Sequence, residues 1–369
     1  MDKARELEAK LERVLKFLSE NNLDGVVLNR TANFAWLGCG ADNVVNAAEE
    51  TGVGTLVATP RGITLVSKNI ETQRLITEEL AGLDLVHSVS YPWYEPRQRE
   101  AEIGKLTADG IFAADDGSCD LPPLPESWNR LRYTMTESEI RRYRKLGQDS
   151  SAAMETAARA VERGMTEHQI ASLVAKEYRS RGLIPVVLLV AVDDRIREWR
   201  HPLPKDLALE NYAMLVACGR RRGLVTAMTR FVHFGKMAED LRQRHEAVCE
   251  VDARIINATK PGLTAADVFE IAQEAYDEVG FPDEWQLHHQ GGAIGYQPRE
   301  YIADPGCQEE VLTNQAFAWN PSICGTKNED TVLVTGEGPE LLTSASESWP
   351  TIEVEVEGQT LSRPDMLIR

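Results

Sequence analysis

The chain has 369 residues, which is enough for two domains and a substantial hydrophobic core. Its formal net charge of −18 argues against nucleic acid or an anionic membrane surface as a partner. Hydrophobic residues make up 43% of the chain and no apolar run approaches the length of a membrane span, so the composition predicts a globular, soluble protein.

The N-terminus and the cysteines favour a cytoplasmic location. The charged start, Met1 to Glu6, begins a helical apolar pattern and does not resemble a signal peptide. Six cysteines are scattered along the chain without a CxxC pair. This distribution is typical of reduced, mostly structural thiols.

The first 125 residues have the pattern of an α/β domain. The helical and β-rich patterns in it cover residues 4–20, 25–28, 54–59, 62–66 and about 69–80. Thr59–Gly62 is a predicted hairpin turn. The segment Leu121–Pro125 is the best linker candidate, because proline resists both helix and strand. We therefore predict two domains, residues 1–125 and 126–369.

The second half contains an internal repeat. Gly164–Gly182 and Gly262–Gly280 are both nineteen residues long, with threonine and tyrosine at the same places in each. Thr166 and Thr264 are candidate N-caps, and the closing glycines are candidate C′ residues. A strand hairpin follows each copy, at residues 212–219 with 224–233 and at 315–323 with 331–335. Common caps can coincide by chance, but the repeated order favours duplication, with a curved sheet and a groove where the halves meet.

Three segments carry a resemblance to a known superfamily. Asn33–Leu37 lies in the first domain, the glycine-rich turn Gly291–Gly295 lies in the second, and Glu329-Asp330-Thr331 opens a late strand. In this order the chain resembles the pita-bread superfamily of aminopeptidase P, prolidase and creatinase over nearly its whole length. The resemblance implies a creatinase-like α/β domain followed by a duplicated α+β pita-bread domain.

Metal-dependent members of this superfamily hold metal with two aspartates, one histidine and two glutamates. By resemblance, these positions fall on Ala217, Ala227, Gly292, Asn320 and Glu329. Only Glu329 keeps a ligand, and one carboxylate cannot hold a dinuclear divalent site. We therefore expect no metal and no other cofactor.

Creatinase-like members of the superfamily work without metal and use a histidine as general acid and base. His201, with the Pro-Leu-Pro that follows it, resembles the segment that carries this histidine. We expect His201 and Glu329 to be catalytic. The alternatives are a loop histidine bound to a backbone carbonyl, and an ion pair between Glu329 and Arg230 that fixes the sheet. Because Ala227 and Gly292 depart from the creatinase pattern, creatine is not the expected substrate.

Four further residues are candidates for binding the substrate. Arg230 and Arg299 can each clamp a carboxylate in bidentate fashion. Asn320 would position water or a substrate nitrogen, and Lys327 would supply positive charge beside Glu329.

Two histidines complete the candidate set. His288 and His289 are expected on a strand, so we predict that they face opposite sides and that at most one of them points into the groove. By the same alternation, Glu329 and Asp330 point opposite ways and do not share a proton. Cys218 is a possible nucleophile, although a small buried cysteine is the more common case.

The favoured hypothesis is a metal-independent hydrolase, creatinase-like or Xaa-Pro-peptidase-like, that cleaves a C–N bond in a small polar substrate bearing a carboxylate. The second hypothesis is a catalytically inactive relative that acts as a binding or partner protein. The third is an Xaa-Pro-type metallopeptidase with rearranged ligands such as His201, His289 and Glu329. A titratable group in reach of a ligand favours the first over the second, and metal analysis isolates the third.

We expect a small-molecule or short peptide-like substrate as partner, and neither nucleic acid nor a membrane. The resemblance also implies a homodimer, because relatives place the N-terminal domain over the groove of the partner. Asn33–Leu37 and Tyr91–Tyr94 are the expected apolar contact surface.

Overall fold

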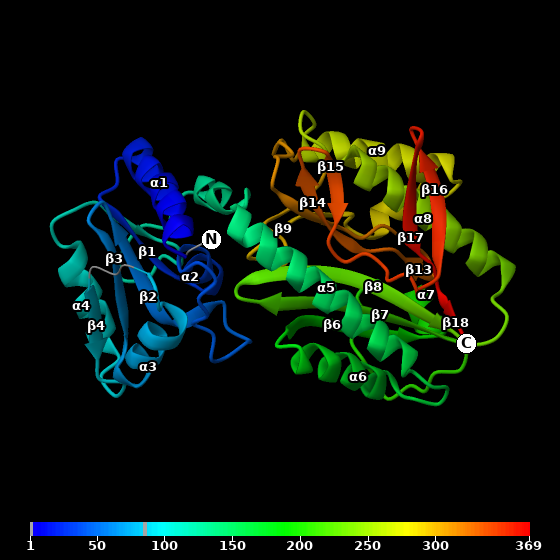
Figure 1. The fold of residues 1–369 in the computed structure, drawn as a ribbon, viewed down its shortest axis with the longest axis horizontal. Coiled ribbons are helices and arrows are strands. Elements are labelled where there is room, and N and C mark those ends of the chain that lie inside the picture. The colour runs from blue at the N-terminus through cyan, green and yellow to red at the C-terminus, as the bar shows by residue number, and fades with distance from the viewer. Residues whose placement is uncertain (1–2, 84–86) are drawn as a thin grey trace. The chain divides into compact units, whose positions relative to one another are not determined.

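The chain folds into two compact units, which are described separately. The computed structural model describes residues 3–83 and 87–369 (Figure 1). The first unit comprises Met1–Arg132 with Thr136–Ser138, and the second comprises Tyr133–Met135 with Glu139–Arg369. The Leu121–Pro125 segment lies in the first unit, where the Ala114 backbone exchanges hydrogen bonds with residues 122 and 124.

The first unit is built on a mixed five-stranded sheet in the order β4-β3-β2-β1-β5. Its strands are β1 (Gly25–Arg30), β2 (Thr51–Thr59), β3 (Gly62–Lys68), β4 (His87–Tyr91) and β5 (Phe112–Ala114). The β2–β3 hairpin turns at Thr59–Gly62, as predicted. The pairs β1–β5 and β3–β4 are parallel, and β1–β2 and β2–β3 are antiparallel. Apolar residues of three strands, such as Val27, Val57 and Val66, meet in a core beside the sheet.

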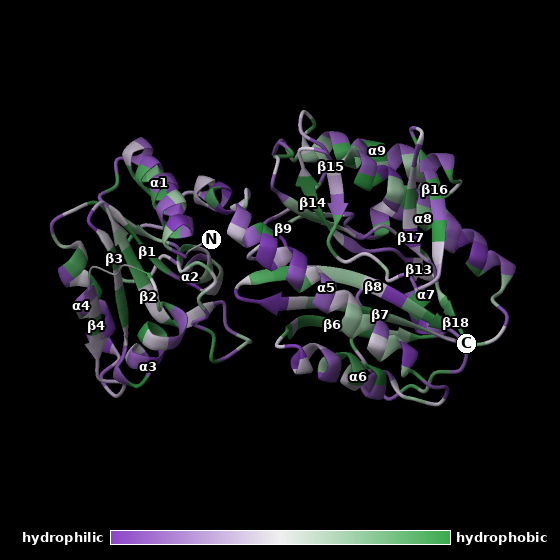
Figure 2. Ribbon diagram, in the orientation of Figure 1, coloured by the Kyte–Doolittle hydropathy of each residue, from purple (hydrophilic) through white to green (hydrophobic). Residues whose placement is uncertain are grey.

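The first unit also contains several helices. They are α1 (Lys3–Asn21), α2 (Thr31–Leu37), α3 (Asn69–Arg74), a π-helix (Leu75–Glu79), α4 (Arg97–Thr107) and a 3-10 helix (Glu126–Arg132). Hydrophilic and hydrophobic residues are mixed along α1 in Figure 2, and apolar residues such as Leu7, Val14 and Leu18 are buried. The helix predicted at about residues 69–80 is divided, because α3 gives way to the wider π-helical turn at Leu75.

The expected dimer surface requires a correction in this unit. All of Asn33–Leu37 is buried inside the unit, so α2 offers no apolar surface to another chain. Trp93 and Tyr94 are 56% and 64% exposed, and remain available for contact.

The second unit repeats a pair of helices. Helices α5 (Glu137–Arg159) and α6 (Glu167–Ser180) form the first pair, and α8 (Glu239–Ala258) and α9 (Ala265–Glu278) form the second. The predicted caps are confirmed, because Thr166 and Thr264 each form a capping box at the start of the shorter helix. The glycines that follow, at positions 182 and 280, have φ of 71° and 83°, a left-handed conformation that suits a residue without Cβ.

Two sheets lie beside these helices. The first has the order β18-β8-β7-β6 and the second the order β10-β9-β11-β14-β15. The strands of the first are β6 (Ile184–Val192), β7 (Tyr212–Arg221), β8 (Leu224–His233) and β18 (Leu367–Ile368). Those of the second are β9 (Gly291–Ile294), β10 (Tyr301–Ile302), β11 (Ala316–Trp319), β14 (Asp330–Thr335) and β15 (Gly338–Leu341).

Short elements complete the unit. Two ladders pair β12 (Ser322–Ile323) with β13 (Thr326–Lys327), and β16 (Thr351–Val356) with β17 (Gln359–Pro364). Helix α7 (Asp194–Glu198) follows β6, and a 3-10 helix (Glu284–Leu287) precedes β9. Within residues 3–83 and 87–369, no helix is both long enough and apolar enough to cross a membrane.

The two sheets of the second unit are joined between β8 and β14. The Thr229 amide donates a hydrogen bond to the Glu329 carbonyl at 3.1 Å. The Thr331 hydroxyl accepts a hydrogen bond from the Ala227 amide and donates one to the Ala227 carbonyl. One continuous curved sheet was expected, whereas the structure has two sheets that meet at this seam. Glu329 lies directly on the seam, so the fold brings the residues around it together from both halves.

Candidate functional site

A pocket of about 310 Å³ lies where the two halves of the second unit meet. Strands β6 and β7 supply an apolar wall, and the segments around β9, β11 and β13 supply the polar groups. The lining residues are Val187, Leu189, His201, Val216, Cys218, His289, Pro298, Arg299, Asn320, Lys327 and Glu329. Six predicted site residues are therefore together in one cavity.

Strand register decides which residues of β7 and β8 face this pocket. Ala227 pairs directly with Cys218, and Ala217 pairs with Met228. Since Val216 and Cys218 line the pocket, alternation turns the Ala217 side chain to the other face of β7. The placement of the first aspartate position at Ala217 is thus corrected, and Cys218 is the residue that faces the pocket opposite Ala227.

Glu329 is buried and held between two cations. Its carboxylate lies 2.8 Å from the Lys327 ammonium and 3.5 Å from the Arg299 guanidinium, and it accepts a hydrogen bond from Thr229 at 2.7 Å. Burial is the largest single influence and raises the pKa of Glu329. The charges of Lys327 and Arg299, together with the hydrogen bonds from Lys327 and Thr229, outweigh it, so the pKa lies below the usual value. The carboxylate is therefore ionised at neutral pH.

The charges lining the pocket do not cancel. Lys327 and Arg299 carry two positive charges, and Glu329 carries the one negative charge among the described lining residues. A buried excess charge is costly without a counter-ion. The pocket is consequently suited to a ligand with a single anionic group.

Asn320 connects Arg299 to the histidines. Its side-chain oxygen accepts from Arg299 at 2.9 Å, and its amide nitrogen donates to the His289 carbonyl at 2.9 Å. Asn320 is 1% exposed, and both ends of its amide are engaged. It holds Arg299 in place, whereas the sequence predicted that it positions water or a substrate nitrogen.

Three histidine rings meet at the edge of the pocket. His201 follows α7, and the ring centroids of His288 and His289 lie 4.9 Å and 5.6 Å from that of His201. The two neighbours lie between the 3-10 helix and β9, outside any strand, so the prediction that they face opposite sides is wrong. His289 lines the pocket, while His288 bonds to His201 at 3.1 Å between their Nε2 atoms and to Ser322 at 3.0 Å.

The histidines are kept neutral by their surroundings. Burial and then Lys327 lower the pKa of His201, and Glu329 only partly opposes this. Burial and then Arg299 lower the pKa of His289 to about 4. The pKa of His288 lies far below its usual value, mainly because of burial. Burial and Lys327 therefore outweigh the Glu329 carboxylate, and the pKa of His201 stays below its usual value.

Electrostatics argue against the thiol of Cys218 as a nucleophile. Burial, and then the charge of Glu329, raise its pKa to about 12. A thiol with this pKa stays protonated at neutral pH, and the thiolate is the reactive form. Cys218 therefore belongs to the apolar wall.

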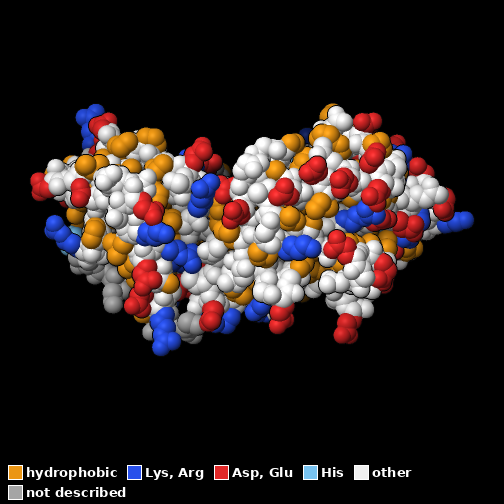
Figure 3. All heavy atoms as spheres, turned by 90° about the horizontal axis from the view of Figure 1, so that it is seen from above, with side chains coloured by type: hydrophobic (Ala, Val, Ile, Leu, Met, Phe, Trp, Pro, Cys, Tyr) orange, Lys and Arg blue, Asp and Glu red, His pale blue; other side chains and the backbone are white. Residues whose placement is uncertain are grey.

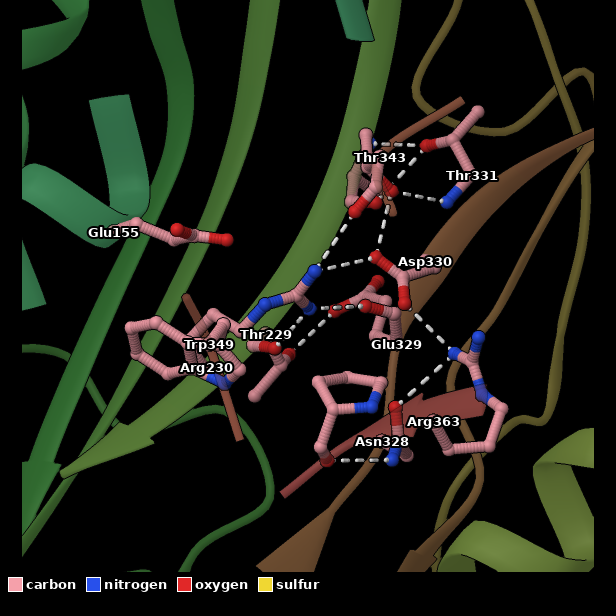
Figure 4. A network of polar contacts seen from close by, with 12 residues as sticks. Glu155, Thr229, Arg230, Asn328, Glu329, Asp330, Thr331, Thr343, Trp349 and Arg363 are labelled. Carbon is pink, nitrogen blue, oxygen red and sulfur yellow. Dashed lines mark hydrogen bonds and ion pairs between the residues drawn. The ribbon is translucent and has the colours of Figure 1, made fainter. Parts of the chain in front are cut away.

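Arg230 is placed outside the pocket, which corrects its predicted role as a substrate clamp. Its guanidinium points to Asp330 at 3.0 Å and to the Thr343 carbonyl at 2.7 Å, and Figure 4 shows it within this polar network. Arg230 is 1% exposed. The proposed ion pair with Glu329 is replaced by one with Asp330, because Glu329 and Asp330 point to opposite sides of β14 as predicted.

Sequence reasoning missed the apolar wall and one polar partner. Val187 and Leu189 alternate on β6 and Val216 lies on β7, but apolar strands of this kind give no sign of which face is open. Ser322 stands two residues after Asn320, and only the turn between β11 and β12 brings it to His288.

The superfamily that the sequence resembles has five metal-ligand positions. The residues at these positions in this chain do not suit a site for two metal ions. Cys218 and Ala227 face the pocket from the hairpin, and Asn320 and Lys327 stand beside Glu329. Gly292 has φ of 152°, and a Cβ there would lie 2.3 Å from the Tyr301 carbonyl oxygen. No histidine fits at that position without a backbone shift. Glu329 already has Lys327 as its counter-ion.

Comparison with known proteins relates the chain that carries this site to a protein family. The model of metallopeptidase family M24 matches residues 141–336. An uncharacterized peptidase of Staphylococcus aureus (strain MW2) is 26% identical over 227 residues, which is 58% of this chain. The matched region spans 63% of that relative.

Solved structures share the fold over nearly the whole chain. An Xaa-Pro dipeptidase from Bacillus anthracis has a TM-score of 0.79 at 17% identity, covering 98% of this chain and all of the other. The N-terminal domain of FACT complex subunit SPT16 from chickpea (Cicer arietinum) has a TM-score of 0.72 at 12% identity, covering 92% and 96% of the two chains. The fold is accordingly the pita-bread fold, and the family match over more than half of the residues shows that the chain belongs to metallopeptidase family M24.

Proposed function

We propose that this protein is a metal-independent hydrolase that cleaves a C–N bond in a small, polar compound bearing one carboxylate. The observation that carries the proposal is a pocket with one surplus positive charge and a neutral histidine at its edge. Arg299 and Lys327 bind the substrate carboxylate, and His201 performs the proton transfers. Membership of a peptidase family supports hydrolysis of a C–N bond.

The chemistry follows from the groups in the pocket. Neutral His201 takes a proton from water as the water oxygen attacks the carbon of the scissile bond. The imidazolium then returns the proton to the nitrogen, which leaves as the C–N bond breaks. Glu329 offsets one of the two positive charges of Lys327 and Arg299, and the substrate carboxylate offsets the other. The negative charge of Glu329 also favours the imidazolium.

A dipeptide fits this description of the substrate. It has a single C-terminal carboxylate and one peptide C–N bond. The Bacillus anthracis protein of the same fold is named an Xaa-Pro dipeptidase. The cavity of about 310 Å³ is at the lower end for ligand sites, which favours a small compound.

The second candidate function is binding without catalysis. It is favoured by one observation, that the same fold occurs in a domain of a FACT complex subunit. In this case the pocket would hold a carboxylate-bearing metabolite or peptide end and His201 would only contribute a hydrogen bond.

Turnover of defined dipeptides tests the proposal. Glycyl-proline and alanyl-proline are incubated with the chelator-treated full-length protein, and the released amino acids are measured. Binding of the same dipeptides is measured separately by calorimetry. We expect turnover that resists chelator and falls by about 100- to 10,000-fold in His201→Ala, while binding persists. Binding without turnover in the wild type would support the second candidate, and turnover that is lost to chelator and restored by metal would refute metal independence.

A further inference from the structure

We propose that His288 is a positioning residue that fixes the tautomer of His201, with the proton on Nε2 and the lone pair on Nδ1. His288 does not line the pocket, so it acts through its neighbour. The catalytic meaning of this tautomer rests on the proposed function. The tautomer itself follows from hydrogen bonds between described residues.

The orientation of the Asn320 amide is the first step. Arg299 has only donors, so the Asn320 atom that lies 2.9 Å from its Nη2 must be the side-chain oxygen. The His289 carbonyl has only an acceptor, so the atom 2.9 Å from it must be the amide nitrogen. Two independent partners thus assign the same orientation.

The tautomer of His288 is the second step. The amide nitrogen of Asn320 has a second hydrogen, and it lies 3.2 Å from His288 Nε2. Nε2 must therefore accept and carry a lone pair. Because buried His288 is neutral, its proton is on Nδ1, which lies 3.0 Å from the Ser322 hydroxyl and donates to it.

The tautomer of His201 is the third step. Its Nε2 lies 3.1 Å from the same Nε2 of His288. Two lone pairs at this distance would repel, so His201 Nε2 must carry a hydrogen and donate it. The lone pair of neutral His201 is then on Nδ1, the one ring nitrogen able to take a proton from water. After that transfer, His288 still accepts from the Nε2–H of the imidazolium.

A metal ion is the competing explanation for the short contact. The ligand atoms of His201, His288 and His289 all lie within 4.8 Å of one another. Lys327 lowers the pKa of all three rings, so its charge opposes a further cation there. Asn320 also directs an N–H at the lone pair that a metal would need. The hydrogen bonds satisfy both ring nitrogens of His288 and the Nε2 of His201 without an ion.

Nitrogen-15 spectroscopy of the full-length protein reads the tautomers directly. Histidine labelled with nitrogen-15 is recorded at pH 7.5 after chelator treatment, and the rings are assigned with single-histidine variants. We expect His201 as the Nε2–H form and His288 as the Nδ1–H form. The near-isosteric Asn320→Asp removes the donor to His288 Nε2, so we expect His288 to place its proton on Nε2 and His201 to lose its fixed tautomer. His289→Gln is the matched control and should leave both tautomers unchanged, because only the backbone of His289 takes part.

The outcomes separate this proposal from the proposed function. A proton on Nδ1 of His201, or zinc that shifts all three rings at one equivalent, would overturn the tautomer assignment. If the tautomers are as expected but no dipeptide is hydrolysed, the proposed function fails and the arrangement stands. Where turnover is found, His288→Leu should lower kcat by about 10-fold or more at unchanged KM. His288→Gln, whose side-chain oxygen can accept from His201, should restore most of it, and equal loss in both variants would contradict positioning.

Discussion

Glu329 combines three tasks at the scale of a single residue. It neutralises Lys327, contacts Arg299, and adds the negative charge that partly offsets the lowering of the pKa of His201. The pKa of His201 is thus set by competition between burial with Lys327 on one side and Glu329 on the other. Removing the carboxylate leaves only the influences that lower it.

Glu329→Gln should therefore shift the pKa of His201 further down. With the negative charge gone, the imidazolium loses stabilisation, so His201 becomes the free base at lower pH than in the wild type. The acid limb of any pH–rate profile should move to lower pH while the maximal rate falls. A nitrogen-15 titration of His201 measures the shift without a substrate. A pKa that rises or stays fixed would show that Glu329 does not act on this histidine.

A buried ionic network stabilises the seam between β8 and β14 at the scale of elements. Arg230 pairs with Asp330 at 3.0 Å, and Arg363 on β17 pairs with Asp330 at 2.7 Å (Figure 4). Arg363 also pairs with Asp252 of α8 at 2.6 Å. Two guanidinium groups and two carboxylates alternate, so the charges balance. Four side chains at 0% exposure thus tie β8, β14, β17 and α8 together behind the pocket.

Arg363→Met should destabilise the second unit by about 3–5 kcal/mol, because it leaves Asp252 and Asp330 buried with too little positive charge. Urea unfolding followed by circular dichroism measures the change. The control is Arg144→Met, which breaks the exposed pair with Glu340 and should cost no more than about 1 kcal/mol. Equal effects of the two substitutions would contradict a special role for the buried network.

The metal content of the whole molecule is a direct check on the site. Ala227, Gly292 and Asn320 offer no carboxylate or imidazole, and Lys327 occupies the side of Glu329. We expect purified protein to contain far less than one equivalent of zinc, manganese or cobalt per chain. Elemental analysis after dialysis measures this. One or two equivalents that survive dialysis would contradict the expectation, and loss of the metal in His201→Ala would point to the three histidines.

The assembly of the whole molecule is the last expectation. We propose a homodimer whose contact includes Trp93 and Tyr94, which are exposed in the first unit. Light scattering at micromolar concentration should give twice 41.1 kDa, and Trp93→Ser with Tyr94→Ser should lower that mass. A wild-type mass of 41.1 kDa would exclude the dimer.

Surface charge bears on partners at the same scale. On the face shown in Figure 3, acidic and basic side chains are interspersed. A small-molecule partner stays a prediction.

The sequence by itself determined the local signals and the fold. The repeated Gly-x-Thr starts predicted the N-caps at Thr166 and Thr264, because a cap depends on a few neighbouring residues. Residues 291–295 and 329–331 carried the resemblance to the pita-bread superfamily. Alternation along β14 correctly predicted that Glu329 and Asp330 diverge.

Only the tertiary structure decided which residues share the pocket. Pairing of β7 with β8 brings Cys218, and not Ala217, opposite Ala227, and a shift of one residue in register reverses the facing of a whole strand. The β8–β14 seam places Arg230 behind the sheet with Asp330, while a loop brings Arg299 to Glu329. Register and loop paths depend on contacts between segments far apart in the chain, and no local pattern of residues specifies them.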